Sequence, residues 1–180
     1  MGLVEMKQGE GTYIKYFDSE KSSLAMASPL LMDKMDVLNL VEVRKVFETG
    51  SAMYAARNRT EEDIEQMLNI LEDMKTAIGD IKKEKETDIA LHLAIAEATH
   101  NPLIVSLMKN ITKTMTIKMQ ETRQIWLCSE MTTVDLLDDH KKIVMAIMEQ
   151  DEEKAQSLMH KHISVVEDNV AAYYGELNMK

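Results

Sequence analysis

Apolar side chains recur every three or four positions along most of the chain, which is the period of an amphipathic α-helix. The pattern begins near residue 32, and short polar, Gly or Pro segments interrupt it. The segments that we expect to be helical are about 32–58, 60–78, 84–99, 102–127, 133–149 and 151–174. Amphipathic helices with connections this short are typical of an antiparallel bundle. The pattern therefore predicts an all-α fold, an antiparallel helical bundle of six to seven helices.

Several of these helix ends carry a recognisable signal. Thr60 is a preferred N-cap residue, and Asp63 follows three positions later, as in a capping box. Gly79 is placed to end the second helix, because glycine readily adopts the conformation that closes a helix. Asn101 before Pro102 reads as a cap followed by proline at the first helical position.

The first residues do not follow the helical pattern. Residues 1–15 hold two short β-prone runs around a Gly-rich turn, which predicts a β-hairpin. A single hairpin is not stable by itself, so we expect a remnant of a larger unit, or a hairpin packed on another part. Residues 16–31, which contain Asp, Ser and Lys and end near Pro29, are predicted to be a linker, and residues 32–180 are predicted to form the helical domain.

The composition narrows the class of protein. A net charge of −10 makes this chain by itself a poor ligand for nucleic acid, whose phosphates supply most of the non-specific affinity. Cys128 is the single cysteine, which excludes an internal disulfide and a thiolate zinc cluster and fits a reducing cytoplasm. No signal-peptide pattern opens the chain, and no apolar run approaches the ~20 residues that span a membrane. We expect a cytoplasmic protein with no membrane contact.

Two polar residues interrupt the apolar face of the third predicted helix. Asp88 and His92 lie on that face, where leucine would be expected. A buried carboxylate must be neutralised, paired or bound to a cation, because burying it alone costs several kcal/mol. An aspartate with a histidine four residues later is also a workable spacing for two ligands of one metal ion.

Two further histidines lie in the middle of apolar stripes, His140 in the fifth predicted helix and His162 in the sixth. His160 points to nearly the opposite side of its helix at about 100° per residue. If the three helices are neighbours, three imidazoles and one carboxylate can converge, a ligand set that suits Zn, Mn, Fe, Co or Ni. The alternative is that each histidine is a core residue with a satisfied hydrogen bond.

Arg44 and Glu48 lie four residues apart on the apolar face of the first predicted helix. A guanidinium there can grip a carboxylate ligand with two hydrogen bonds. It can equally form an intrahelical ion pair with Glu48, and the residues leave both readings open.

Taken in order, these motifs resemble a known family. The set comprises Val41-Glu42-Val43-Arg44 with Glu48, Asp88-Ile-Ala-Leu-His92, Asn101-Pro102, Asp139-His140 and His162. It resembles the C-terminal effector domain, the FCD domain, of FadR-type GntR transcriptional regulators, over about residues 36–170. The resemblance implies an antiparallel helical bundle and no catalytic residues. It also implies that a divalent transition metal such as Zn, Ni, Mn or Fe is held by Asp88, His92, His140 and His162.

The resemblance also suggests ligands and partners. The metal in such domains helps to bind a small organic acid, often a carboxylate or a sugar acid, and Arg44 matches a basic residue that contacts the acid. Thr122 and Trp126 share the inner face of the fourth predicted helix and are candidates for lining the pocket, with a core role as the alternative. A homodimer is expected, as is common among similar proteins.

Residues 1–15 resemble the wing hairpin of the family's winged helix-turn-helix domain, whose recognition helix this chain lacks. We therefore expect a truncated product that contacts DNA only through the missing N-terminal domain.

The predicted function is effector sensing in a bacterial transcriptional regulator, not an enzymatic activity. One alternative is a metal-dependent hydrolase of helical-bundle type, since a His-rich site could activate water. Against it, no acid or base stands out beyond the four proposed ligands, and Glu97 faces away from them. A second alternative is a metal-free helical interaction module in which the histidines only pack.

Overall fold

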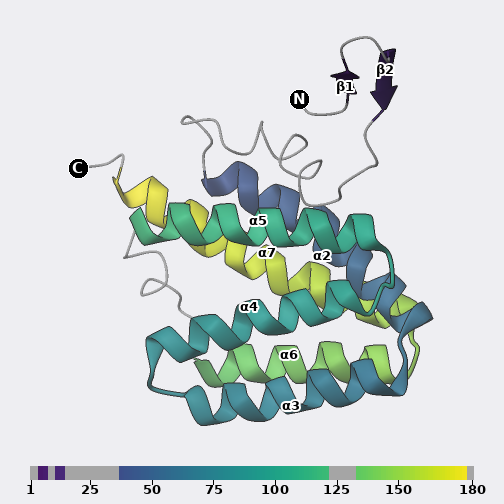
Figure 1. The fold of residues 1–180 in the computed structure, drawn as a ribbon. Coiled ribbons are helices and arrows are strands. Elements are labelled where there is room, and N and C mark those ends of the chain that lie inside the picture. Colours follow the sequence, from purple (N-terminus) through teal and green to yellow (C-terminus); the bar gives the residue numbers. More distant parts are fainter. Residues whose placement is uncertain (1–3, 8–10, 15–36, 122–132, 178–180) are drawn as a thin grey trace.

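The computed structural model of the protein describes residues 4–7, 11–14, 37–121 and 133–177. Within these residues the chain forms an all-α bundle, as predicted (Figure 1). Its helices are α2 (Val37–Asn58), α3 (Glu61–Ala77), α4 (Ile81–Glu97), α5 (Pro102–Glu121), α6 (Thr133–Met148) and α7 (Glu152–Leu177). None of the described helices combines the length and the apolar character needed to cross a membrane.

Two short strands precede the helices. β1 (Val4–Lys7) pairs with β2 (Gly11–Ile14) in antiparallel register, with Val4 opposite Ile14 and Lys7 opposite Gly11. Gly11 has a φ of +106°, a conformation that glycine adopts without the steric cost of a Cβ atom. The helices, and not these strands, define the fold class. The assignment of residues 1–15 to a winged-helix remnant stays a prediction, and the predicted linker 16–31 lies outside the described residues.

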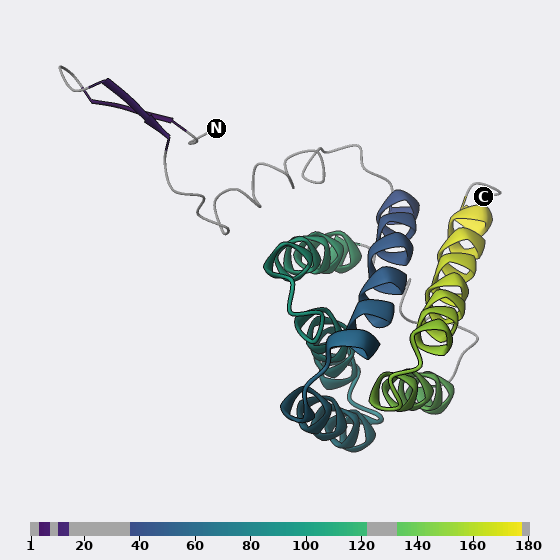
Figure 2. The ribbon, with the colours of Figure 1, turned by 90° about the vertical axis from the view of Figure 1, so that its right-hand side faces the viewer.

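Helix α2 is central to the bundle, because it contacts α4, α5, α6 and α7. Figure 2 shows its long side-by-side contact with α7, and α3 and α4 pack against each other as a helical hairpin. The side chains between the helices form one hydrophobic core. Its largest fully buried members are Leu40, Val41, Met67, Leu91, Ile95, Met108, Ile111, Ile143, Ile147, Met159 and Ile163.

The ends of α3 and α4 follow the sequence signals, with one difference. Thr60 and Asp63 form the predicted capping box, and Gly79 has a φ of +92° just after α3. Helix α4 begins at Ile81 rather than at residue 84, because the Asp80 side chain caps it by accepting a hydrogen bond from the Lys83 backbone N–H.

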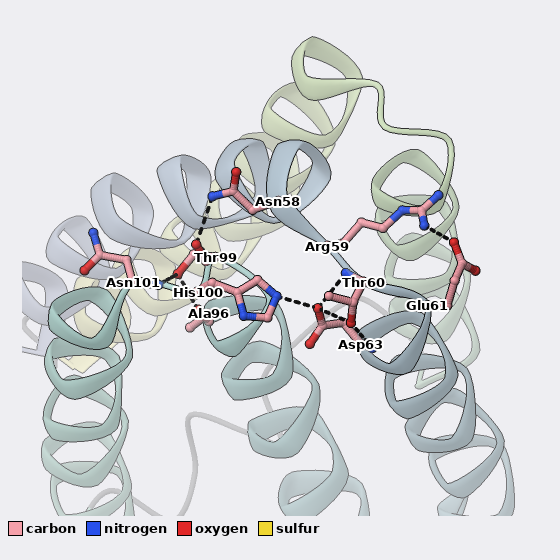
Figure 3. A network of polar contacts seen from close by, with 9 residues as sticks. All are labelled: Asn58, Arg59, Thr60, Glu61, Asp63, Ala96, Thr99, His100 and Asn101. Carbon is pink, nitrogen blue, oxygen red and sulfur yellow. Dashed lines mark hydrogen bonds and ion pairs between the residues drawn. The ribbon is translucent and has the colours of Figure 1, made fainter.

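A network of polar contacts joins the end of α4 to the α2–α3 corner (Figure 3). Asn58 Nδ2 donates to the Thr99 carbonyl at 2.9 Å, and His100 Nε2 lies 2.8 Å from Asp63 Oδ2. His100 also has a φ of +52°, so the chain reverses sharply there before α5. These contacts fix the C-terminal end of α4, the helix that carries Asp88 and His92, against α2 and α3.

Candidate metal centre and adjoining pocket

The structure brings together the four residues that the sequence suggested as metal ligands. Asp88 and His92 come from α4, His140 from α6 and His162 from α7, and one ligand atom of each lies within 4.8 Å of all the others. The ring centroid of His162 is 5.3 Å from that of His92 and 4.5 Å from that of His140. His160 is exposed on the other side of α7, as its helical position predicts.

The three histidines are buried, with exposed fractions of 4% for His92, 0% for His140 and 2% for His162. Within the described part of the chain, both ring nitrogens of His92 and His140 and Nδ1 of His162 lack a hydrogen-bond partner. Buried polar atoms in folded proteins almost always have a partner. A cation among these nitrogens would supply it, so the residues present fit a bound metal.

Asp88 points its carboxylate at the same centre. Its Oδ1 atom lies 3.4 Å from His140 Nε2 and 3.7 Å from His92 Nε2, which is at or beyond the limit of a hydrogen bond. Burial raises the pKa of Asp88, but the charge of His92, then that of His140 and Arg44, outweighs burial and holds the pKa well below its usual range. The carboxylate is therefore ionised and available as an oxygen ligand at neutral pH.

The histidines differ in protonation because their surroundings differ. Burial lowers the pKa of His92, but the carboxylates of Glu48 and Asp88 outweigh it and raise the pKa to about 9. Burial is the main cause that lowers the pKa of His140 to about 4 and holds that of His162 well below its ordinary value. His140 and His162 are thus neutral at pH 7, the form that binds metals, whereas the carboxylates of Glu48 and Asp88 favour the protonated ring of His92, which must lose that proton to bind a metal.

Glu48 is a member of the site whose role the sequence reasoning missed. Its side chain is buried, its Oε1 accepts a hydrogen bond from Arg44 Nε at 2.5 Å, and its Oε2 is in close contact with His92 Nδ1. Burial raises the pKa of Glu48, but the interactions with Arg44 and then with His92 outweigh burial and lower the pKa to about 2. The spacing within α2 indicated the Arg44 pair, whereas the contact with His92 depends on the packing of α2 against α4.

A pocket opens beside the candidate metal centre, between α2, α4 and α5. Its lining consists of Arg44, Lys85, Asp88, Ile89, His92, Thr112, Met115 and Thr116. Arg44 lines this pocket and also forms the ion pair with Glu48, so the two interpretations of Arg44 are compatible, and its contact with an acid stays a prediction. Lys85, Thr112 and Thr116 were not anticipated. The predicted pocket residues Thr122 and Trp126 lie outside the described residues.

Glu97 is no candidate base for the site. Its Oε1 atom is 3.1 Å from Lys109 Nζ on α5, in an ion pair of two partly exposed side chains. The structure thus agrees with the expectation that Glu97 faces away from the four residues.

The fold and the site together define a class of protein, a helical bundle with buried histidines beside a cationic pocket. Comparison with known proteins shows which family the chain belongs to. Residues 39–165 match the family model described as the FCD domain, and the chain belongs to this family of GntR-type regulators. The protein is therefore a regulator and not an enzyme.

Among individual relatives, the chain is similar to the HTH-type transcriptional regulator LutR of Bacillus subtilis. The two are 41% identical over 98% of this chain and 81% of LutR. The Uxu operon transcriptional regulator of Escherichia coli is 27% identical over 96% of this chain and 68% of that protein. The structure of Streptococcus agalactiae GntR shares the fold, with a TM-score of 0.65 over 92% of this chain and 74% of that one, at 24% identity.

Proposed function

We propose that this chain is the sensing part of a GntR-type regulator, in which Asp88, His92, His140 and His162 hold a divalent transition metal beside a pocket for a small organic acid. The single observation that supports the metal most strongly is that each of three buried histidines, with Asp88, offers one ligand atom to a common centre, while ring nitrogens of these histidines lack hydrogen-bond partners in the described structure. A metal-free module would leave these nitrogens desolvated at a cost of about 1–3 kcal/mol each.

The pocket has the chemistry expected for an acid. Arg44 and Lys85 supply two positive charges, and the hydrogen bond of Arg44 to Glu48 uses its Nε group. The two Nη groups of Arg44 are therefore placed to donate to a ligand carboxylate, which a guanidinium binds with two parallel hydrogen bonds. When bound, a divalent metal at this centre supplies a Lewis-acidic positive charge to a carboxylate oxygen.

Two threonines on α5 favour an acid that also carries hydroxyl groups, such as a hydroxy acid or a sugar acid. Thr112 and Thr116 line the same pocket as Arg44. The Thr116 hydroxyl donates to the Thr112 backbone carbonyl at 2.9 Å, so the lone pairs of its oxygen remain to accept a hydrogen bond from a ligand hydroxyl.

In the whole regulator, binding of the acid favours one arrangement of the bundle and so changes the affinity for DNA. We further propose that the protein acts as a homodimer in the cytoplasm. An acid can shift the arrangement only if it binds one arrangement more tightly than the other, so its effect on DNA binding is bounded by that difference in affinity.

The test is metal analysis of the purified protein, followed by calorimetric titration of organic acids with and without a divalent metal. We expect about one metal ion per chain and acid binding that weakens when the metal is removed. Absence of metal, with unchanged melting after chelation, would favour the metal-free module, and turnover of an ester or phosphoester would favour the hydrolase.

A further inference from the structure

The carboxylate of Glu48 lies between two functional side chains of the proposed site. It is 2% exposed and sits on α2, one turn after Arg44 and against His92 of α4. Each of its oxygens faces a different donor, since Oε1 accepts from Arg44 Nε at 2.5 Å and Oε2 contacts His92 Nδ1. Within the described structure, His92 Nδ1 and Glu48 Oε2 are buried and make no hydrogen bond of good geometry, so their ion-pair contact is the interaction that each has within reach.

The ring of His92 is held between two carboxylates. Nδ1 faces Glu48, while Nε2 faces Asp88 Oδ1 at 3.7 Å on the side where His140 Nε2 also points. The two nitrogens of an imidazole are not equivalent, because a hydrogen bond at one decides which of them is left to bind a metal. The contact with Glu48 thus leaves Nε2 of His92 for the common centre.

Arg44 is oriented by the same carboxylate. Because Glu48 takes the Nε–H group, the remaining donors of the guanidinium are those at its Nη end, and Arg44 lines the pocket next to Asp88 and His92. One buried carboxylate therefore contacts both a candidate metal ligand and the candidate acid-binding residue.

We propose that Glu48 is a positioning residue that directs Nε2 of His92 to the metal and the Nη groups of Arg44 to the pocket. The inference rests on the proposed metal site but adds a residue outside the ligand set. The competing role for Glu48 is only to neutralise Arg44. That role affects stability, but it does not alter the metal affinity or the hydrogen bond at His92 Nδ1.

The variant Glu48→Gln separates these roles. The glutamine side chain has nearly the same shape, but it offers one acceptor oxygen and one NH₂ donor in place of two acceptors. It cannot accept from both Arg44 Nε and His92 Nδ1, so one donor faces another donor. Glu48→Asp keeps the charge and both acceptors but shortens the reach to His92 by one methylene, and it serves as the second variant if glutamine prevents folding.

Zinc is titrated into wild type and variants freed of metal, and the ring nitrogens of ¹⁵N-histidine-labelled protein are followed by NMR. We expect the zinc affinity of each Glu48 variant to fall roughly 10- to 100-fold. We also expect the slowly exchanging Nδ1 proton of zinc-loaded His92 to be lost. Glu167→Gln is the matched control, because the same change neutralises the carboxylate that pairs with Lys45 Nζ, 2.8 Å away on the α2–α7 contact, outside the site.

The possible outcomes separate the two proposals. Wild type that binds neither zinc nor nickel overturns the metal site itself. Wild type that binds zinc, with a folded Glu48 variant matching it within about twofold and retaining the Nδ1 proton, overturns the role of Glu48 and leaves the metal site intact. A tenfold loss of zinc affinity in Glu167→Gln as well would assign the effect to general destabilisation and would also overturn the role of Glu48.

Discussion

Removing His140 should abolish the stabilisation of this protein by zinc. His140 is 0% exposed and lies within 4.8 Å of the other candidate ligand atoms, so His140→Ala deletes one of four ligands without a substitute from solvent. A ligand present at 100 times its Kd stabilises the folded state by about 2.7 kcal/mol. In a chain of this size 1 kcal/mol shifts Tm by roughly 2–4 °C, so zinc should raise the Tm of wild type by roughly 5–11 °C.

The assay is thermal unfolding followed by circular dichroism, with zinc and with chelator, for wild type, His140→Ala and His160→Ala. Only the zinc-dependent rise in Tm is compared, because the cavity left by a truncated side chain costs stability under both conditions. His160 is the matched control, since it lies on α7 two residues before His162 but is exposed. Its backbone carbonyl accepts the Ser164 hydroxyl at 2.8 Å, a contact that alanine retains.

We expect zinc to raise the Tm of wild type and of His160→Ala by the full amount. In His140→Ala and in His162→Ala we expect the zinc-dependent rise in Tm to be less than about 2 °C. Equal rises in all the variants would refute the assignment of His140 and His162 to the centre. Loss of the rise in His160→Ala together with the others would refute the assignment of helical faces.

The remaining predictions concern the pocket, a helix cap and assembly. Arg44→Ala should weaken binding of a carboxylate ligand roughly 10- to 100-fold, the equivalent of ~1.5–3 kcal/mol for a charged hydrogen-bonded contact, at unchanged metal content; unchanged acid affinity by calorimetry would reject the role of Arg44. Asp63→Asn should destabilise by roughly 0.5–1 kcal/mol at pH 7 in urea unfolding. Burial raises the pKa of Asp63, but the hydrogen bonds with Thr60 and then the interaction with His100 outweigh burial and hold the pKa below its ordinary value. The ionised form therefore stabilises the fold fully above the unfolded pKa of about 3.8. The difference from Asp63→Asn should shrink as the pH falls below that value and through the lower folded pKa; a constant difference down to about pH 2 would contradict it. Light scattering at micromolar concentration should show a dimer, and a monomer would count against the proposed assembly.

The helices and their faces could be read from the sequence because they depend on local chemistry. The capping box of Thr60 with Asp63 and the stop at Gly79 were predicted and are present. The start of α4 was placed three residues late, because residues 81–83 are mostly polar and the cap at Asp80 was not recognised. The predicted segment 122–127 lies outside the described residues, so its helical character stays a prediction.

The candidate metal centre was predictable in part. Helical spacing placed Asp88 and His92 on one face, and His140 and His162 on the apolar faces of two other helices, where a polar side chain is conspicuous. The contact of Glu48 with His92 was not predictable in this way. Glu48 had a sufficient partner one turn earlier in Arg44, and a local pattern cannot reveal a second partner on another helix.

The sequence by itself thus determined which side chains each helix turns toward the interior, because that depends only on 3.6 residues per turn and the preference of apolar groups for burial. Only the tertiary structure decided which interior faces meet. The packing of α2 against α4 and α7 and of α6 against α7 brings the histidines of three helices to one centre and sets Glu48 against one of them. That packing depends on the shapes of side chains far apart in the chain, and no local period encodes them.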